Sequence, residues 1–305
     1  MRVLVTGATG YVGSYILRAL LDTGHTPRAL VRGSAADLAV EDADLEAVRG
    51  NVTAPSSLTA CVADCDAVIH LVGILEEHPA QGVTYERIHV DGTRHVVEAA
   101  RKAGVDHFVH MSANGARPEG GTGYQETKWR AEQLVVDAGF AHWTIFRPSL
   151  LFGAPDPGRP EFASQVLRDL VRPFPILPVF GDGTYELQPV HVRTVADAFV
   201  QALTTDATHG QTYAAAGPDR FPYVEVLDRI ARGAGLEPKP KLHIPMPLAR
   251  LGVYTAGRIG LLPIGPAQFE MLVEGNTGDE TAFFETFDLS PRPFSPDTLS
   301  YLRSR

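Results

Sequence analysis

Residues 3–17 read VLVTGATGYVGSYIL, and this stretch decides the fold. It starts as a short apolar run and ends with apolar residues at helical spacing, and Gly7, Gly10 and Gly13 lie in the turn and at the helix start. A glycine-rich turn between a strand and a helix presents unpaired N–H groups and a positive dipole end to phosphates. The glycine spacing alone is a weak signal, but its position favours a dinucleotide site over a tight turn without a ligand.

The alternation of strand and helix continues downstream. Strands are expected at residues 1–6, 27–32, 45–50, 67–72, 107–112 and 143–146, and helices at residues 11–22, 56–64, 85–103 and 124–138. Such alternation predicts a parallel sheet with helices on both faces. The strand segments AVIHLV and HFVHMS are largely apolar, as expected when both faces are covered. We therefore predict an α/β fold of the Rossmann type with a doubly wound parallel sheet.

The regular alternation ends where proline and glycine become dense, at residues 153–160. Beyond them, helical segments at 161–171, 195–203 and 223–234 mix with short strands. We predict an NAD(P)-binding Rossmann domain over residues 1–154. A smaller mixed α/β lobe over residues 155–305 is expected on the substrate side, and the pattern leaves open whether the two interleave.

Composition narrows the class of protein. The chain has 305 residues, of which 44% are hydrophobic and 21% charged, as is usual for a globular protein that folds on its own. Its net charge of −9 argues against nucleic acid as a partner. No apolar run reaches the roughly 18–20 residues needed to cross a bilayer, and the N-terminus does not resemble a signal peptide. We expect a cytoplasmic protein.

Metal and hydrolase chemistry find little support in the sequence. The two cysteines, Cys61 and Cys65, fall in a predicted helix and are interpreted as small apolar core residues. The eleven histidines show no H-E-x-x-H spacing, so no metal site is expected. We interpret His70, His107 and His110 as hydrogen-bonded structural residues. A G-x-S-x-G nucleophile elbow is also missing.

The residue after the second strand bears on the choice of cofactor. Dinucleotide folds usually carry an acidic residue there for the ribose diol, but this chain has Arg32, nineteen residues after Gly13. A guanidinium suits a 2′-phosphate. The sequence therefore favours NADP(H) as the cofactor and leaves NAD(H) open. The alternative interpretation of Arg32 is a solvated loop residue without a role in cofactor binding.

Six segments resemble the extended and atypical short-chain dehydrogenases/reductases. They are TGATGYVG (6–13), HLVGIL (70–75), HVDGTRHVVEAA (89–100), HMSANGA (110–116), YQETK (124–128) and RPSLLFG (147–153). The chain most resembles the branch of the complex I 39 kDa subunit and its bacterial relatives, often called nucleoside-diphosphate-sugar epimerase-like. That likeness extends through FGDGTYELQPVHVRTVADAF (180–199) and PAQFEMLVEGN (266–276).

The resemblance implies a set of cofactor contacts. It places Thr9, Tyr11 and Val12 with the glycines around the pyrophosphate, and Asn51 and Val52 near the adenine. It also implies that the middle of the cofactor is lined by Leu71, Val72 and Gly73, and that Pro148 flanks the nicotinamide.

Tyr124 and Lys128 carry the predicted chemistry. They are four residues apart on a predicted helix and so share a face, where an ammonium beside a phenol favours the phenolate. Such a tyrosine can exchange a proton with a carbonyl or alcohol while nicotinamide exchanges hydride at the same carbon. Lys128 would also hold the nicotinamide ribose. By analogy with the family, Ser112 at a strand end polarises the substrate oxygen.

The chain departs from the pattern of active family members at His89. They carry Asn in an N-x-x-G-T segment where this chain has HVDGT, so a water-linked proton relay is absent or altered. Two functions stay open. One is an NAD(P)-dependent oxidoreductase or epimerase acting on a carbonyl or secondary alcohol, with a small-molecule substrate or a quinone-like ligand. The other is a non-catalytic NADP(H)-binding assembly or redox-sensing module of a respiratory or quinone-related complex.

Residues 244–272 are poor in charge, with only Arg250, Arg258 and Glu270. The segment could line a hydrophobic pocket or contact a membrane surface or a partner protein. Helices packed on the second lobe are the favoured interpretation.

Overall fold

The computed structural model of the chain describes residues 1–159, 161–255 and 264–304. Two compact units emerge from its contacts. The first comprises Met1–Pro148, Val192–Ala215 and Glu280–Ser290, and the second Ser149–His191, Ala216–Asp279 and Pro291–Arg305. The sequence analysis placed a single boundary after residue 154. By contacts, the chain leaves the first unit after Pro148 and returns to it twice.

The first unit is built on a seven-stranded sheet in the order β11-β6-β5-β4-β1-β2-β3. All neighbouring strands in it are parallel. Because the order reverses at β1, the carboxyl ends of the strands form one edge with a crevice suited to a ligand. The predicted Rossmann fold is confirmed. The strands are β1 (Arg2–Thr6), β2 (Thr26–Val31), β3 (Glu46–Arg49), β4 (Ala67–His70), β5 (His107–Met111), β6 (His142–Pro148) and β11 (Gln211–Ala215).

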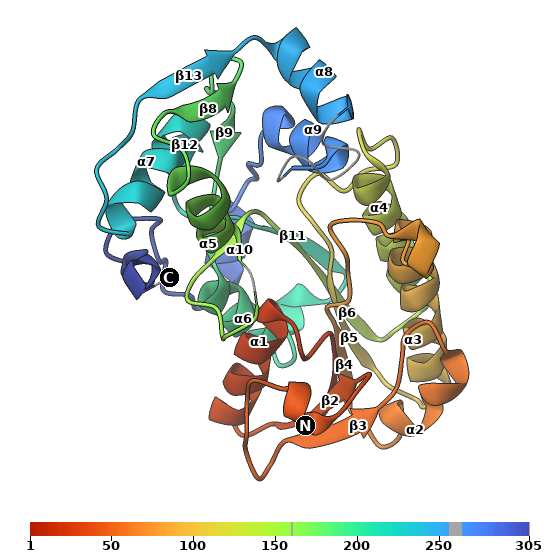
Figure 1. Ribbon diagram of the computed structural model, residues 1–305. Coiled ribbons are helices and arrows are strands. Elements are labelled where there is room, and N and C mark those ends of the chain that lie inside the picture. The colour runs from red at the N-terminus through yellow and green to blue at the C-terminus, as the bar shows by residue number, and fades with distance from the viewer. Residues whose placement is uncertain (160, 256–263, 305) are drawn as a thin grey trace. The chain divides into compact units, whose positions relative to one another are not determined.

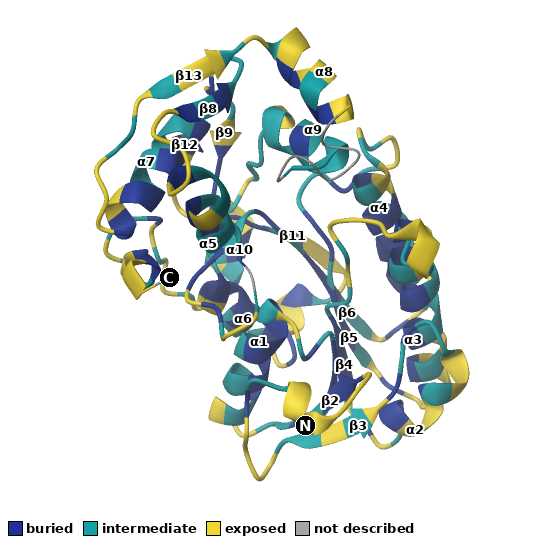
Figure 2. Cartoon of the chain, in the orientation of Figure 1, coloured by how far each residue is buried: buried dark blue, intermediate teal, exposed yellow. Residues whose placement is uncertain are grey.

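Helices cover both faces of this sheet, as expected for strands that are buried on both sides (Figures 1 and 2). One face carries α1 (Tyr11–Asp22) and α6 (Val192–Gln201), and the other α3 (Gly92–Lys102) and α4 (Gly123–Val136). Shorter elements of the unit are α2 (Thr59–Val62), α10 (Thr281–Thr286) and 3-10 turns at Ala35–Asp37, Pro55–Ser57, Pro79–Gln81 and Asp206–Thr208.

Two predicted helices differ from those observed. The helix expected at 85–103 begins with a π-helical turn at Glu86–Asp91, and α3 starts only at Gly92. Single π-helical turns often occur at functional sites, and this one contains His89. The helix expected at 56–64 is a 3-10 turn followed by the four-residue α2. Cys61 lies in α2 and Cys65 beyond it, and both are buried free thiols.

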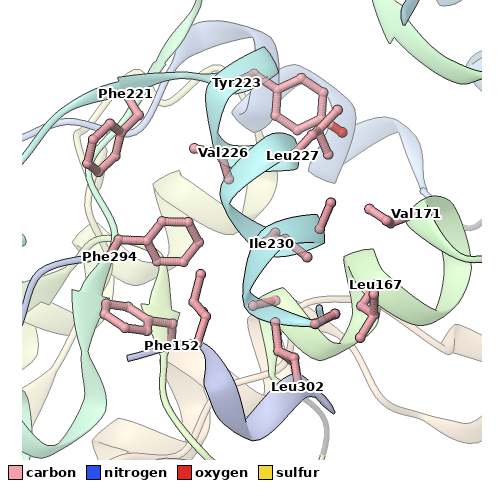
Figure 3. Packing of buried hydrophobic residues seen from close by; sticks show 14 of the residues in the cluster. Phe152, Leu167, Val171, Phe221, Tyr223, Val226, Leu227, Ile230, Phe294 and Leu302 are labelled. Carbon is pink, nitrogen blue, oxygen red and sulfur yellow. The ribbon is translucent and has the colours of Figure 1, made fainter. Parts of the chain in front are cut away.

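The second unit mixes short strand pairs with helices around its own core. Figure 3 shows Phe152 and Phe294 beside α7, with their ring centroids 4.9 Å apart in an edge-to-face arrangement. Its strand pairs are β7 (Leu151–Phe152) with β10 (Val190–His191), β8 (Leu177–Phe180) with β13 (Lys241–Ile244), and β9 (Glu186–Leu187) with β12 (Phe221–Pro222). Its helical elements are α5 (Phe162–Val166), a π-helical turn at Leu167–Val171, α7 (Tyr223–Gly233), α8 (Met246–Thr255), α9 (Pro266–Glu274) and a 3-10 turn at Ser300–Ser304.

Candidate active site

The glycine turn connects β1 to α1 with a geometry that requires glycine. Gly7 has φ = +77°, which side chains with a Cβ rarely adopt. A Cβ on Gly13 would lie 2.4 Å from the Gly7 carbonyl oxygen and 2.7 Å from the Ala8 Cα. Gly13 therefore allows the first turn of α1 to pack directly on the chain that leaves β1.

The N-terminus of α1 fits a dinucleotide pyrophosphate. Its N-cap residue is Gly10, no side chain caps it, and its first turn has no acidic residue. A helix start of this kind offers N–H donors and a positive dipole end to an anion. Thr9 lies in the turn, and Tyr11 and Val12 begin the helix. The residues present therefore fit the phosphate-binding role that the sequence predicts.

The other predicted cofactor residues follow strands at the carboxyl edge of the sheet. Arg32 directly follows β2 and is exposed. Asn51 lies just beyond β3, and its Oδ1 accepts a hydrogen bond from the Thr53 N–H at 3.0 Å. The Val52 carbonyl oxygen is paired with His95 Nδ1 at 2.7 Å. After β4 come Leu71, Val72 and Gly73, and Pro148 is the last residue of β6.

Lys128 is a buried cation at this edge. It is 3% exposed, and its Nζ donates to the Met111 carbonyl oxygen at 2.8 Å. A Cβ on Gly73 would lie 3.2 Å from Nζ, so glycine makes room for the ammonium. Burial lowers the pKa of Lys128 to about 8, although Glu132 opposes the shift. Glu132 forms a bidentate pair with Arg147 at 2.8 and 2.6 Å.

Tyr124 lies one helical turn before Lys128 on α4. The sequence analysis predicted that the ammonium would favour the phenolate. In the structure, burial raises the pKa of Tyr124, and Tyr85 raises it further. Lys128 donates its ammonium proton to the Met111 carbonyl oxygen. The raised pKa keeps Tyr124 a protonated phenol that can donate a proton.

Ser112 is the first residue after β5. Its N–H donates to the Phe146 carbonyl oxygen at 2.8 Å, which continues the strand pairing with β6 by one residue. The side chain is 2% exposed, and no described residue hydrogen-bonds its hydroxyl. Ser112 and Tyr124 thus lie on neighbouring elements without a mutual hydrogen bond in the described residues.

His89 contacts the helix that carries Tyr124 and Lys128. Its Nε2 accepts the Ile74 N–H at 3.1 Å, so the ring proton is assigned to Nδ1, which lies 3.0 Å from the Thr127 hydroxyl. The ring stacks on Tyr85 at 5.3 Å and meets the Tyr124 ring at 5.4 Å. Burial, with a contribution from Lys128, lowers the pKa of His89 to about 2. His89 is a fixed neutral imidazole with both nitrogens in use.

The sequence analysis missed two features around these residues. Tyr85, whose hydroxyl donates to the Leu75 carbonyl oxygen at 2.8 Å, carried no motif beyond its spacing of four from His89. The second is the difference between His70 and His110. His70 bonds to Thr6 at 2.6 Å and Thr93 at 3.0 Å, as expected of a structural histidine. For His110 that interpretation is wrong, because no described residue bonds either nitrogen.

Among the described residues there is no group of three or more His, Cys, Asp or Glu side chains that could hold a metal ion. No described helix is both long enough and apolar enough to cross a bilayer.

The model of the NAD dependent epimerase/dehydratase family matches residues 3–216. Ceramide reductase of Caulobacter vibrioides is 30% identical over 257 residues, which are 84% of this chain and 76% of that protein. The mitochondrial NADH-ubiquinone oxidoreductase 40 kDa subunit of Neurospora crassa is 30% identical over 240 residues, which are 75% of this chain and 59% of the subunit.

The fold is also seen in solved structures. The UDP-glucuronic acid 4-epimerase of Bacillus cereus, in complex with UDP-glucuronic acid and NAD, superposes with a TM-score of 0.76. The match covers 100% of this chain and 98% of the epimerase at 18% identity, so it supports the fold alone.

Proposed function

Because the chain belongs to the NAD dependent epimerase/dehydratase family, we propose that it is a nicotinamide-dependent oxidoreductase acting on a carbonyl or secondary alcohol. The observation that carries the proposal is the position of Lys128. Its buried ammonium lies beside Gly73 at the carboxyl edge of the sheet, one helical turn after the protonated Tyr124. A buried, charged side chain is uncommon unless function requires it.

The cofactor supplies hydride exchange at the substrate carbon when it is bound. The chain holds it through the glycine turn and the N-terminus of α1, whose N-cap is Gly10. We favour NADP(H), because the exposed Arg32 at the end of β2 can receive a 2′-phosphate. NAD(H) is the alternative, since the epimerase of similar fold holds NAD.

Each of the three site residues has a distinct role in the proposed chemistry. In the reducing direction, Tyr124 donates its phenolic proton to the substrate oxygen as that oxygen gains negative charge. The Lys128 ammonium then stabilises the phenolate that Tyr124 becomes. Ser112 donates a hydrogen bond to the same substrate oxygen, keeps its own proton, and so polarises the carbonyl. Burial keeps Tyr124 protonated beforehand, so the site is suited to reduction.

We propose a substrate with a large apolar part. Ceramide reductase is named for a lipid, and α8 carries three exposed apolar residues at a spacing of three, Leu248 (60%), Leu251 (64%) and Tyr254 (50%). They fall within residues 244–272, for which contact with a membrane surface or a protein complex is the alternative to helices packed on the second lobe. We propose that these residues of α8 meet a lipid surface; residues 256–263 of the segment lie outside the described part of the chain.

The hydrogen bonding of His89 favours a second function. His89 replaces the asparagine of active members, and its one ring proton is already donated to Thr127, because both of its nitrogens are bonded. In this second function the chain binds NADP(H) as a structural ligand or redox sensor of a quinone-related complex; its similarity to a protein named as a 40 kDa subunit of NADH-ubiquinone oxidoreductase supports this. Turnover separates this function from the first.

The test is a fluorescence titration with NADPH and NADH, followed by turnover against three probes. The probes are a long-chain ketone, a short-chain ubiquinone and UDP-glucuronic acid. We expect tighter binding of NADPH and turnover of the ketone. Tight binding without turnover of any probe supports the assembly function, and failure to bind either nucleotide contradicts both.

A further inference from the structure

Two polar side chains on β5 and its extension are buried without a described protein partner. His110 is 1% exposed and Ser112 is 2% exposed. No described residue hydrogen-bonds either imidazole nitrogen of His110 or the Ser112 hydroxyl. Buried polar groups in native proteins almost always have a partner, and internal water commonly supplies it. Three unbonded polar atoms on one short segment therefore need a common explanation.

The spacing of the two residues suits one bridging water molecule. Residues two apart on a strand share a face, with their Cα atoms about 7 Å apart. Ser112 keeps this geometry because its N–H continues the ladder to Phe146. At that separation the imidazole and hydroxyl are too far apart for a direct bond, but a single water can bond both at about 2.8 Å each.

The neighbours of His110 fix its plane and its charge. Its ring stacks on that of His70, with centroids 5.4 Å apart and planes 18° apart. Both nitrogens of His70 are bonded to threonines, so His70 cannot serve as its hydrogen-bond partner. Burial, then Lys128, lowers the pKa of His110 well below its ordinary value. His110 is therefore neutral, with one N–H donor and one acceptor nitrogen.

His110 differs from His89 in the hydrogen bonding of its ring nitrogens. The two nitrogens of His89 are taken up by Ile74 and Thr127. Of the buried histidines His70, His89 and His110, only His110 has ring nitrogens that no described residue hydrogen-bonds. A neutral N–H of His110 can donate to a water that in turn donates to the Ser112 oxygen. This arrangement leaves the Ser112 proton free to point at a substrate oxygen.

We propose that one internal water bridges His110 to Ser112, and that His110 is a positioning residue that orients the Ser112 hydroxyl toward the substrate. The catalytic consequence rests on the proposed function, whereas the bridge itself does not. His89 takes no part in orienting Ser112. The residue that does so, His110, lies on the strand that leads to Ser112.

A double-mutant cycle tests the catalytic consequence on whichever of the three probes the wild-type protein turns over. We expect His110→Phe to lower kcat about five- to tenfold, the effect of one water-mediated hydrogen bond, with little change in KM. In a Ser112→Ala background the same change should have no further effect. His110→Gln, which keeps a donor and an acceptor, should restore part of kcat. Equal losses in both backgrounds would overturn the proposal.

Phe108→Leu is the matched control, because Phe108 lies two residues before His110 on the same face of β5 and has no polar atom. It should leave kcat unchanged while lowering stability. A loss of kcat equal to that of His110→Phe would assign the effect to packing and overturn the positioning role.

The bridge is also measurable without turnover. We expect a high-resolution crystal structure to show a water within hydrogen-bond distance of both side chains. Ser112→Ala should shift the 15N resonances of the His110 imidazole. If no probe is turned over, the proposed enzyme fails, yet these two measurements still decide the bridge. Absence of the water together with unchanged 15N resonances would overturn it.

Discussion

Substituting Gly13 by alanine tests the glycine turn most sharply. The added Cβ would lie 2.4 Å from the Gly7 oxygen and 2.7 and 2.8 Å from the Ala8 Cα and carbonyl carbon, all of them backbone atoms. Backbone cannot rotate away as a side chain can, so α1 and the turn must separate. Overpacking of this kind costs about 1–3 kcal/mol, which lowers Tm by about 1.5–5 °C in a chain of this size.

The same shift displaces the N–H groups that are proposed to bind the pyrophosphate. Loss of even one such bond weakens binding about tenfold, so Gly13→Ala should raise Kd for NADPH by at least that factor. Gly252→Ala is the control, because no atom of the described residues lies within 4 Å of a Cβ there and alanine is the better helix former. Thermal unfolding and nucleotide titration of both variants measure the effect. Wild-type Tm and Kd in Gly13→Ala would refute the close packing.

Three further predictions concern charge. Burial is the main cause that lowers the pKa of His107 and of His209. Below pH 6.5 the unfolded chain therefore binds protons that the folded chain does not, and the free energy of unfolding should fall as pH drops. Urea unfolding at several pH values should show a smaller decrease in His209→Asn. Because the pKa of Lys128 is about 8, NADPH affinity should weaken as pH rises through that value, and Lys128→Met should abolish this dependence in a titration series. Arg147→Met leaves the 3%-exposed Glu132 carboxylate unpaired and should cost about 3 kcal/mol, whereas Arg168→Met, which breaks an exposed pair, should cost less than about 1 kcal/mol in urea unfolding.

Much of the fold follows from local sequence signals. The stretch around Gly7 and Gly13 predicts strand, turn and helix, and the repeated alternation predicts a parallel sheet. Since all carboxyl ends of such a sheet lie on one edge, the residues after each strand are candidates for the site before any coordinates are known. Arg32 is a candidate on this ground, whereas Gly73 and Ser112 are implied by the family resemblance; all three follow strands of the sheet.

The remaining features depend on tertiary burial and could not be predicted from spacing. The helical periodicity of residues 85–103 gives no sign of the π-helical turn. That turn contains His89, whose ring nitrogens are hydrogen-bonded to Ile74 and Thr127. The spacing of Tyr124 and Lys128 indicates a shared face, but the pKa of Tyr124 depends on what buries it. The return of the chain to the first unit at Val192 has no local signal, because β11 pairs with a strand more than sixty residues earlier.

The most direct test of the central claim compares the wild-type protein with Tyr124→Phe in NADPH binding and in ketone turnover. Tyr213→Phe is the matched control. It removes a phenolic hydroxyl whose hydrogen bond goes to the Ala207 carbonyl oxygen at 3.4 Å. We predict that all three proteins bind NADPH equally and that Tyr124→Phe alone loses turnover by at least about a hundredfold. Turnover that persists in Tyr124→Phe would contradict the proposed chemistry.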